Sequence, residues 1–144
     1  MPRAEGGAAR IRVTEEHTDD LTVEFPTIND AFTGREHRYQ YALSFPDDLG
    51  THALVKYDRA TGARQIKPFG TGRLPSEAVF VPAGAAMEED GGYLLTVVSD
   101  LNTDSSRLLV LDASDLDLPP VAMVHLPRRV PAVIHGSWIP DTVQ

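Results

Sequence analysis

The sequence predicts an all-β protein, and three observations lead to that class. From residue 21 onward the apolar residues fall in short runs of β-branched and aromatic types, each closed by a Gly, Pro, Asp or Asn cluster. Eleven glycines and eleven prolines among 144 residues interrupt the chain too often for long helices. No segment beyond residue 12 carries an extended helical spacing of apolar residues.

The apolar runs define nine expected strands. Two hairpins follow from turn chemistry: residues 54–58 turn through 59–62 into 64–67, and residues 93–98 turn through 100–106 into 107–111. Gly62 suits the first turn because glycine adopts positive φ at no steric cost. The expected strands are 21–28, 38–45, 52–58, 63–69, 77–82, 93–99, 107–112, 121–126 and 133–139.

Two segments are expected to lie outside the strands. Residues 1–10 are small, polar and aperiodic, which predicts disorder, so the folded domain is expected over 11–144. Residues 112–116 are compatible with one helical turn between strands.

Composition excludes several classes of function. Thirteen Lys and Arg against 21 Asp and Glu give a net charge of −8, and the longest basic run is Arg128-Arg129, which argues against a nucleic-acid groove. The chain has no cysteine, which rules out disulfides, thiolate metal sites and a cysteine nucleophile. Without an apolar leader or a membrane-length apolar run, the expected compartment is the cytoplasm.

A weak internal repeat groups the expected strands. Runs at 23–26 and 77–82 each open a set of four strands, and the run at 134–140 opens a third set that has a single strand. A period of about 50 residues with four strands per unit is typical of β-propeller blades. The sequence therefore predicts about two blades plus one inner strand of a propeller.

The repeat places three polar residues at equivalent positions on successive inner strands. These are Glu24, Glu77 and His135, separated by 53 and 58 residues. Inner strands line the propeller axis, so two carboxylates and an imidazole there suit a metal with carboxylates holding the imidazole rings. The alternative is that they are ordinary polar residues at strand ends.

Five motifs occur in order along the chain: 23–29 with 34–35 and 38–42, 75–82 with 88–91, 108–113, 126–131, and His135-Gly136. Together they resemble the carotenoid cleavage oxygenases, a family that includes retinoid isomerases and lignostilbene dioxygenases. The resemblance extends from about residue 11 to the C-terminus.

The resemblance implies a seven-bladed propeller that holds one Fe(II) with four histidines, three of them oriented by glutamates. His135 matches the last iron ligand, Glu77 the glutamate bonded to that ligand, and Glu24 a second such glutamate. The remaining ligands and the third glutamate are not in this sequence, which resembles roughly the C-terminal third of a family member. Two positions depart from the family pattern: Ala78, often Pro, and Ile134, usually aromatic.

The implied function is oxidative cleavage of a C=C bond in a carotenoid, apocarotenoid or stilbene-like substrate, with O2 as co-substrate and this chain as a C-terminal fragment. One histidine alone holds iron poorly, so the isolated chain is expected to be inactive. The alternative is a catalytically inactive truncated propeller or a β-rich interaction module. Exposed blade edges leave self-association open, and the resemblance leaves open peripheral membrane contact of the full-length enzyme.

The other polar residues have structural interpretations. The remaining histidines have no second ligand at metal spacing, and solvent exposure or loop packing is expected for His17, His37, His52 and His125. Residues 100–104 resemble the start of a calcium loop, but Ser105 stands where that loop needs Gly. Ser76 is interpreted as a strand-entry residue, and Trp138 and Ile139 as core between blades.

Overall fold

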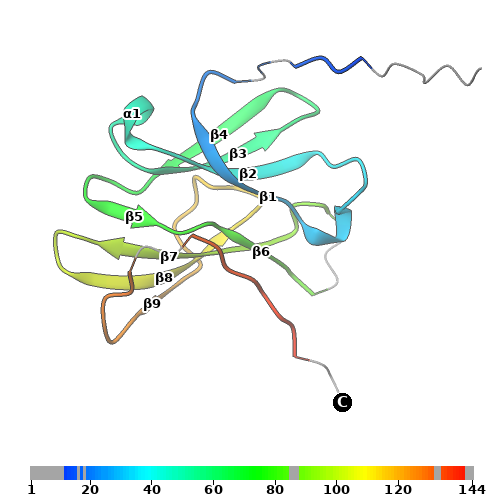
Figure 1. The fold of residues 1–144 in the computed structure, drawn as a ribbon. Coiled ribbons are helices and arrows are strands. Elements are labelled where there is room, and N and C mark those ends of the chain that lie inside the picture. The colour runs from blue at the N-terminus through cyan, green and yellow to red at the C-terminus, as the bar shows by residue number, and fades with distance from the viewer. Residues whose placement is uncertain (1–11, 16, 18, 85–87, 132–133, 142–144) are drawn as a thin grey trace, which may run out of the picture.

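The computed structural model describes residues 12–141 except 16, 18, 85–87, 132 and 133. Within that part the chain forms two antiparallel sheets that lie one over the other (Figure 1). The strands are β1 (Val23–Thr27), β2 (Tyr39–Ser44), β3 (Ala53–Asp58), β4 (Ala63–Pro68), β5 (Arg73–Pro75), β6 (Val79–Pro82), β7 (Gly92–Asp100), β8 (Ser105–Asp112) and β9 (Ala122–His125). No helix of the described part is long and apolar enough to cross a membrane.

The first sheet has the order β1-β2-β3-β4, as expected for one propeller blade. Its outer hairpin closes between Asp58 and Ala63, which are paired in register. Gly62 has φ 72° and donates its N–H to Asp58 O at 2.8 Å, so the positive φ expected for this glycine is what closes the turn.

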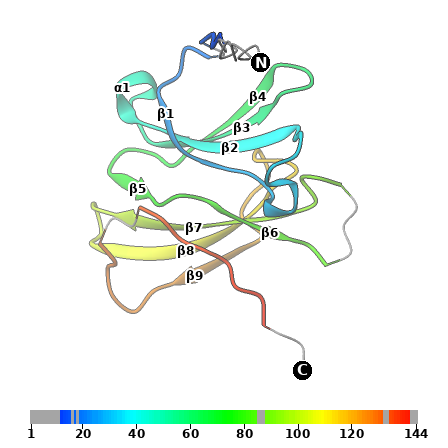
Figure 2. The ribbon, with the colours of Figure 1, turned by 45° about the vertical axis from the view of Figure 1, so that its right-hand side comes forward.

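The second sheet has the order β5-β7-β8-β9, and β6 also pairs with β7. β5 and β6 are therefore two halves of one inner strand along β7. The central hairpin of β7 and β8 is the longest pairing, from Tyr93↔Asp112 to Asp100↔Ser105. Both sheets run outward from an inner strand, and the views in Figures 1 and 2 place the inner strands β1 and β6 on the same side of the molecule.

Each inner strand contains one extra residue relative to its partner. Between Glu24 and Thr27, β1 advances three residues while β2 advances two, from Leu43 to Tyr41. Between Pro75 and Val79, the other inner strand advances four residues while β7 advances three. Such a bulge bends a strand and changes the direction of its side chains. In both blades this change of direction falls at the residues beside Glu24 or Glu77.

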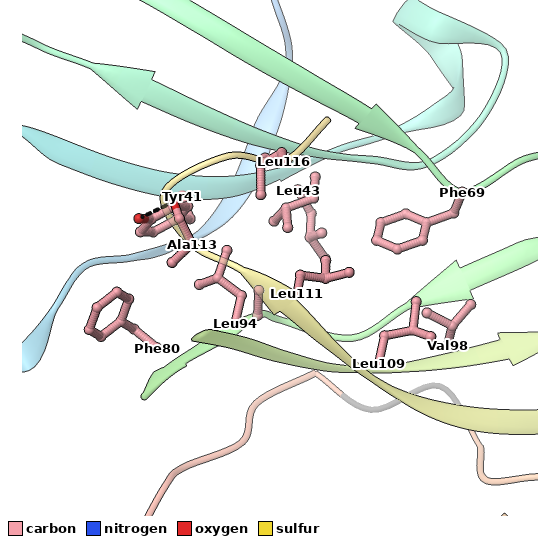
Figure 3. Packing of buried hydrophobic residues seen from close by; sticks show 12 residues of the cluster. Tyr41, Leu43, Phe69, Phe80, Leu94, Val98, Leu109, Leu111, Ala113 and Leu116 are labelled. Carbon is pink, nitrogen blue, oxygen red and sulfur yellow. Dashed lines mark hydrogen bonds between the residues drawn. The ribbon is translucent and has the colours of Figure 1, made fainter. Parts of the chain in front are cut away.

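The core fills the space between the sheets (Figure 3). Alternate residues of β2 and β3 face alternate residues of β7 and β8, as expected where each sheet buries one face. The loop after β8 closes the core with Ala113 and Leu116. The fully enclosed side chains include Tyr41, Leu54, Leu94, Val98 and Leu111.

Polar contacts also join the sheets. The Tyr41 hydroxyl donates to Ala113 O at 2.9 Å, and Lys56 Nζ lies 2.6 Å from Asp90 Oδ2 and 2.7 Å from Ser114 O. The Lys56 and Asp90 side chains are only 7% and 14% exposed. Lys56 also stands 4.4 Å from the centre of the Tyr39 ring, which favours a cation. Low exposure makes this ion pair a structural element of the interface.

The structure confirms the all-β class and corrects several local expectations. Asp112 is the last residue of β8, and residues 113–116 pass through a bend into a turn rather than forming a helical turn. Short helices occur elsewhere in the described chain, at Asp30–Phe32 (η1) and Pro46–Leu49 (α1). α1 begins with Pro46 at its first turn and ends at Gly50, whose φ is 68°, so the two residues define a single turn.

The strand expected over 133–139 is wrong for its described residues, 134–139, which form no strand. A strand needs a hydrogen-bonded neighbour, and no other described segment pairs with this one. The disorder expected for residues 1–10 lies outside the described residues.

Candidate metal-ligand site on the inner strands

Glu77 occupies the bulge between β5 and β6, and Ser76 maintains the ladder there. The N–H of Ser76 donates to Val97 O at 2.8 Å, and the Ser76 hydroxyl oxygen accepts from Val97 N–H at 3.0 Å. The Thr96 hydroxyl donates to Ser76 O at 2.8 Å. These bonds replace those that the bulge interrupts, so Ser76, expected to be a strand-entry residue, has a structural role between β5 and β6 beside Glu77.

Glu77 contacts His135, the residue that the sequence singled out with it. Oε2 of Glu77 lies 3.1 Å from His135 Nδ1 and accepts the backbone N–H of Gly136 at 3.3 Å. A carboxylate only accepts, so the hydrogen of a neutral His135 ring sits on Nδ1. The Nε2 lone pair is then the one available to a metal, and the carboxylate fixes that tautomer.

The neighbouring blade contributes to the same pair through β1. The Phe25 ring meets the His135 ring edge to face, with centroids 5.5 Å apart and planes at 87°. The Thr27 hydroxyl reaches Oε1 of Glu77 at 3.5 Å, a long contact. Residues of two blades therefore contact one largely exposed imidazole, as residues facing a common propeller axis would.

Glu24 does not join this group. It is exposed, and no hydrogen bond to its side chain is found within the described part of the chain. The described residues contain no cluster of three or more metal-ligating side chains. Of the three residues that the sequence singled out, Glu77 and His135 are in contact. The carboxylate of Glu24 lies apart from them on the adjacent inner strand.

The other histidines lie away from this pair. His17 and His125 are exposed, and His37 Nε2 lies 3.2 Å from Arg59 Nη1. His52 packs edge to face against Phe45, with ring centroids 5.3 Å apart, and its burial lowers its pKa. All four positions fit the exposure or loop packing expected from the sequence.

The residues that resemble a calcium loop are used in ion pairs instead. Asp100 Oδ2 accepts from Arg73 Nε at 2.9 Å and Asp104 Oδ1 lies 2.6 Å from Arg129 Nε. The Arg73 contact lowers the pKa of Asp100. Arginines occupy the oxygens that a calcium ion would need, which agrees with the expectation that this turn is structural.

The expectation that Trp138 and Ile139 fill core between blades is wrong in this chain. They are 50% and 82% exposed, because no described element covers that side of them. Trp138 instead borders a hollow of about 230 Å³ beside Glu77, which Thr27 and Phe80 also line.

Sequence reasoning missed the positioning role of Glu89. Its carboxylate accepts the backbone N–H groups of Arg38 and Tyr39 at 2.7 to 3.0 Å, and its carbonyl accepts from Asn29 Nδ2 at 2.9 Å. The acidic residues within 88–91 stand out in the sequence, but the sequence alone does not show that one of them contacts the segment between β1 and β2. Glu89 fixes the end of the segment that follows β1, and so helps to position the inner strand.

Two propeller-type sheets with a histidine that contacts a glutamate at their inner edge define part of a β-propeller. The family model described as retinal pigment epithelial membrane protein matches residues 3–140. The chain belongs to this family, which is that of the carotenoid oxygenases.

Curated relatives and solved structures agree with this assignment. The chain is 38% identical over 137 residues to the carotenoid cleavage oxygenase of Mycobacterium tuberculosis, covering 90% of this chain and 27% of the relative. It is 36% identical over 132 residues to the carotenoid 9,10(9',10')-cleavage dioxygenase 1 of Arabidopsis thaliana, covering 83% and 24%. The crystal structure of cobalt-substituted Synechocystis ACO superposes with a TM-score of 0.79 at 29% identity, covering 85% and 26%. The chain thus spans about a quarter of the length of the relatives it matches.

Proposed function

We propose that this chain supplies His135 as one ligand of an Fe(II) centre in a dioxygenase that cleaves a C=C bond of a carotenoid, apocarotenoid or stilbene-like substrate. The other ligands would come from blades that the chain does not contain. The observation that carries the proposal is the contact of His135 Nδ1 with Glu77 Oε2 at 3.1 Å. The matching relatives, named as carotenoid and apocarotenoid oxygenases, support the substrate class.

The donor chemistry fits a divalent first-row metal. A neutral imidazole brings no charge to the metal, and a carboxylate on its other nitrogen raises its basicity. Imidazole nitrogen is a good ligand for iron and cobalt alike, and a relative has been crystallised in cobalt-substituted form. When bound, the iron would supply the activation of dioxygen. The residues of this chain orient the ring, and Glu24 would act on a histidine of another blade.

The test is a chimera with the Mycobacterium tuberculosis relative, whose matching segment is replaced by residues of this chain. We expect the chimera to bind iron and to cleave a carotenoid, and H135A to lose both. E77Q is expected to lower metal affinity or activity about 10- to 100-fold, the usual effect of removing such a hydrogen-bond partner. The control is H125A on the exposed strand β9, which should leave both unchanged.

Two results would overturn the proposal. One is a folded H135A chimera with full iron content. The other is a folded, iron-loaded chimera that cleaves none of a panel of carotenoids, apocarotenoids and stilbenes, which would favour the alternative of a catalytically inactive propeller segment. Circular dichroism of each variant separates these results from a failure to fold.

A further inference from the structure

We infer that Phe25 is a positioning residue for His135, and that the bulge of β1 holds it there. This inference rests on the proposed function, because it concerns the same imidazole. It adds a residue from the neighbouring blade that the Glu77 contact does not predict. Three observations carry it: the ring geometry, the backbone conformation of Phe25, and the packing behind its ring.

The first observation is the ring contact. The hydrogen bond from Nδ1 to Glu77 is a single contact on a side chain that is 72% exposed, so by itself it leaves the ring free to swing away from the carboxylate that fixes its tautomer. The Phe25 ring lies 5.5 Å away at 87°, a preferred edge-to-face arrangement of aromatic rings. It restricts the remaining rotation, so the direction of the Nε2 lone pair depends on both contacts.

The second observation is backbone strain. Phe25 has φ 55°, and only one other non-glycine residue of the described chain, Asp104, has positive φ. Bulky side chains disfavour this region, and glycine would adopt it without cost. A strained conformation persists only where the surrounding structure enforces it, and such residues cluster at functional sites. Here the strain lies in the bulge between Glu24 and Thr27 and turns the aromatic ring toward His135.

The third observation is that the ring is supported from behind. Phe25 packs against the buried core and lies 6.4 Å from the Phe45 ring, centroid to centroid. Phe45 in turn contacts His52 at 5.3 Å. The ring of Phe25 is therefore held in place against the imidazole of His135. Phe45 is one step further away, because its ring contacts are with Phe25 and His52.

Nuclear magnetic resonance on the isotope-labelled 144-residue chain tests the inference without any catalytic readout. At a pH well above the ordinary histidine pKa of about 6.5, ring ¹⁵N shifts report which nitrogen of His135 carries the hydrogen. Ring-to-ring nuclear Overhauser effects report the contact with residue 25. The variants are F25L and F25M, which remove the ring, F25Y, which keeps it, and the control F45L.

We expect F25L and F25M to lose the ring contact and the excess of the Nδ1–H tautomer. F25Y should keep both, and F45L, which removes only one support of the Phe25 ring, should lose less of either than F25L. Using two ring-deleting variants guards against one that does not fold. A folded F25L or F25M with the wild-type tautomer population would overturn the inference, and so would a loss in F45L as large as that in F25L.

A separate titration keeps the inference and the proposed function distinguishable. Co²⁺ in large molar excess should broaden the His135 ring signals in the wild-type chain and leave those of the exposed His125 less affected. If His135 is not selectively broadened, the metal-ligand proposal fails whatever the tautomer data show. If broadening occurs but the ring-deleting variants keep the wild-type tautomer, the positioning role fails alone.

Discussion

The seam between the two sheets and the inner edge of the same sheets are built in different ways. The seam encloses side chains completely and includes an ion pair whose members are 7% and 14% exposed. The inner edge presents His135 with 72% of its side chain exposed, resting on a Glu77 side chain that is 15% exposed. The comparison teaches that stability and the candidate chemistry reside in separate parts of the fold. Breaking the seam should unfold the chain, whereas breaking the inner edge should leave it folded.

The largest effect is expected in the apolar part of the seam. Leu94 is fully buried on β7, and L94A removes its contacts and leaves a cavity. We expect a loss of about 2 to 5 kcal/mol in the free energy of unfolding, measured by urea denaturation. The control V124A truncates a half-exposed side chain on β9 and should change stability little. Equal losses for the two variants would contradict a seam-centred core.

The buried ion pair should rank second. D90N keeps the shape of Asp90 but removes the charge opposite Lys56, which remains enclosed and bonded to Ser114 O. The expected loss is about 1.5 to 3 kcal/mol, the range for hydrogen bonds that involve a charged group. D47N, on an exposed residue of α1, serves as the matched control. If D90N unfolded at the wild-type urea midpoint, this ion pair would not stabilise the seam.

Acid should weaken the seam through Asp112, at the end of β8. The hydroxyl of Ser114 donates to Asp112 Oδ1 at 2.6 Å and lowers the Asp112 pKa below its ordinary 3.8, with Lys56 contributing. Because the folded-state pKa is the lower one, the unfolded chain binds the proton first. The stabilisation is full above pH 3.8 and is lost as the pH falls through the folded-state value.

The measurement for this prediction is Tm as a function of pH for the wild type and S114A. We expect Tm to fall below about pH 4, and S114A to fall less steeply because its Asp112 pKa lies nearer the unfolded value. Parallel curves for the two proteins would show that the Ser114 contact does not carry the acid dependence.

The sequence predicted the seam and part of the inner edge. Alternating apolar runs and turn residues such as Gly62 act locally, so strands and hairpins follow from a few neighbouring residues. The repeat placed Glu24, Glu77 and His135 at equivalent inner-strand positions, and the family resemblance implied the pairing of Glu77 with His135 that the structure shows.

What the sequence did not show depends on contacts between blades. The strained φ of Phe25 and the one-residue bulges arise from pairing with β2 and β7, and no local motif encodes them. The same holds for Glu89, whose partners lie about 50 residues away. The strand expected at 133–139 was wrong over its described part because apolar alternation indicates a strand but cannot supply the neighbour that it must pair with.

The smallest expected effect on stability is at the inner edge, and it is the sharpest test of the comparison. E77Q weakens the contact with His135, but that histidine is largely exposed, and ion pairs or hydrogen bonds of exposed groups contribute about 0 to 1 kcal/mol. We therefore expect the urea midpoint of E77Q to stay near that of the wild type while the tautomer of His135 shifts. If E77Q destabilised the chain as much as D90N, Glu77 would be part of the framework, and its position beside His135 would no longer argue for a role in metal binding. If E77Q instead changed only the tautomer of the His135 ring, the contact between Glu77 and His135 would affect the candidate chemistry without contributing to folding.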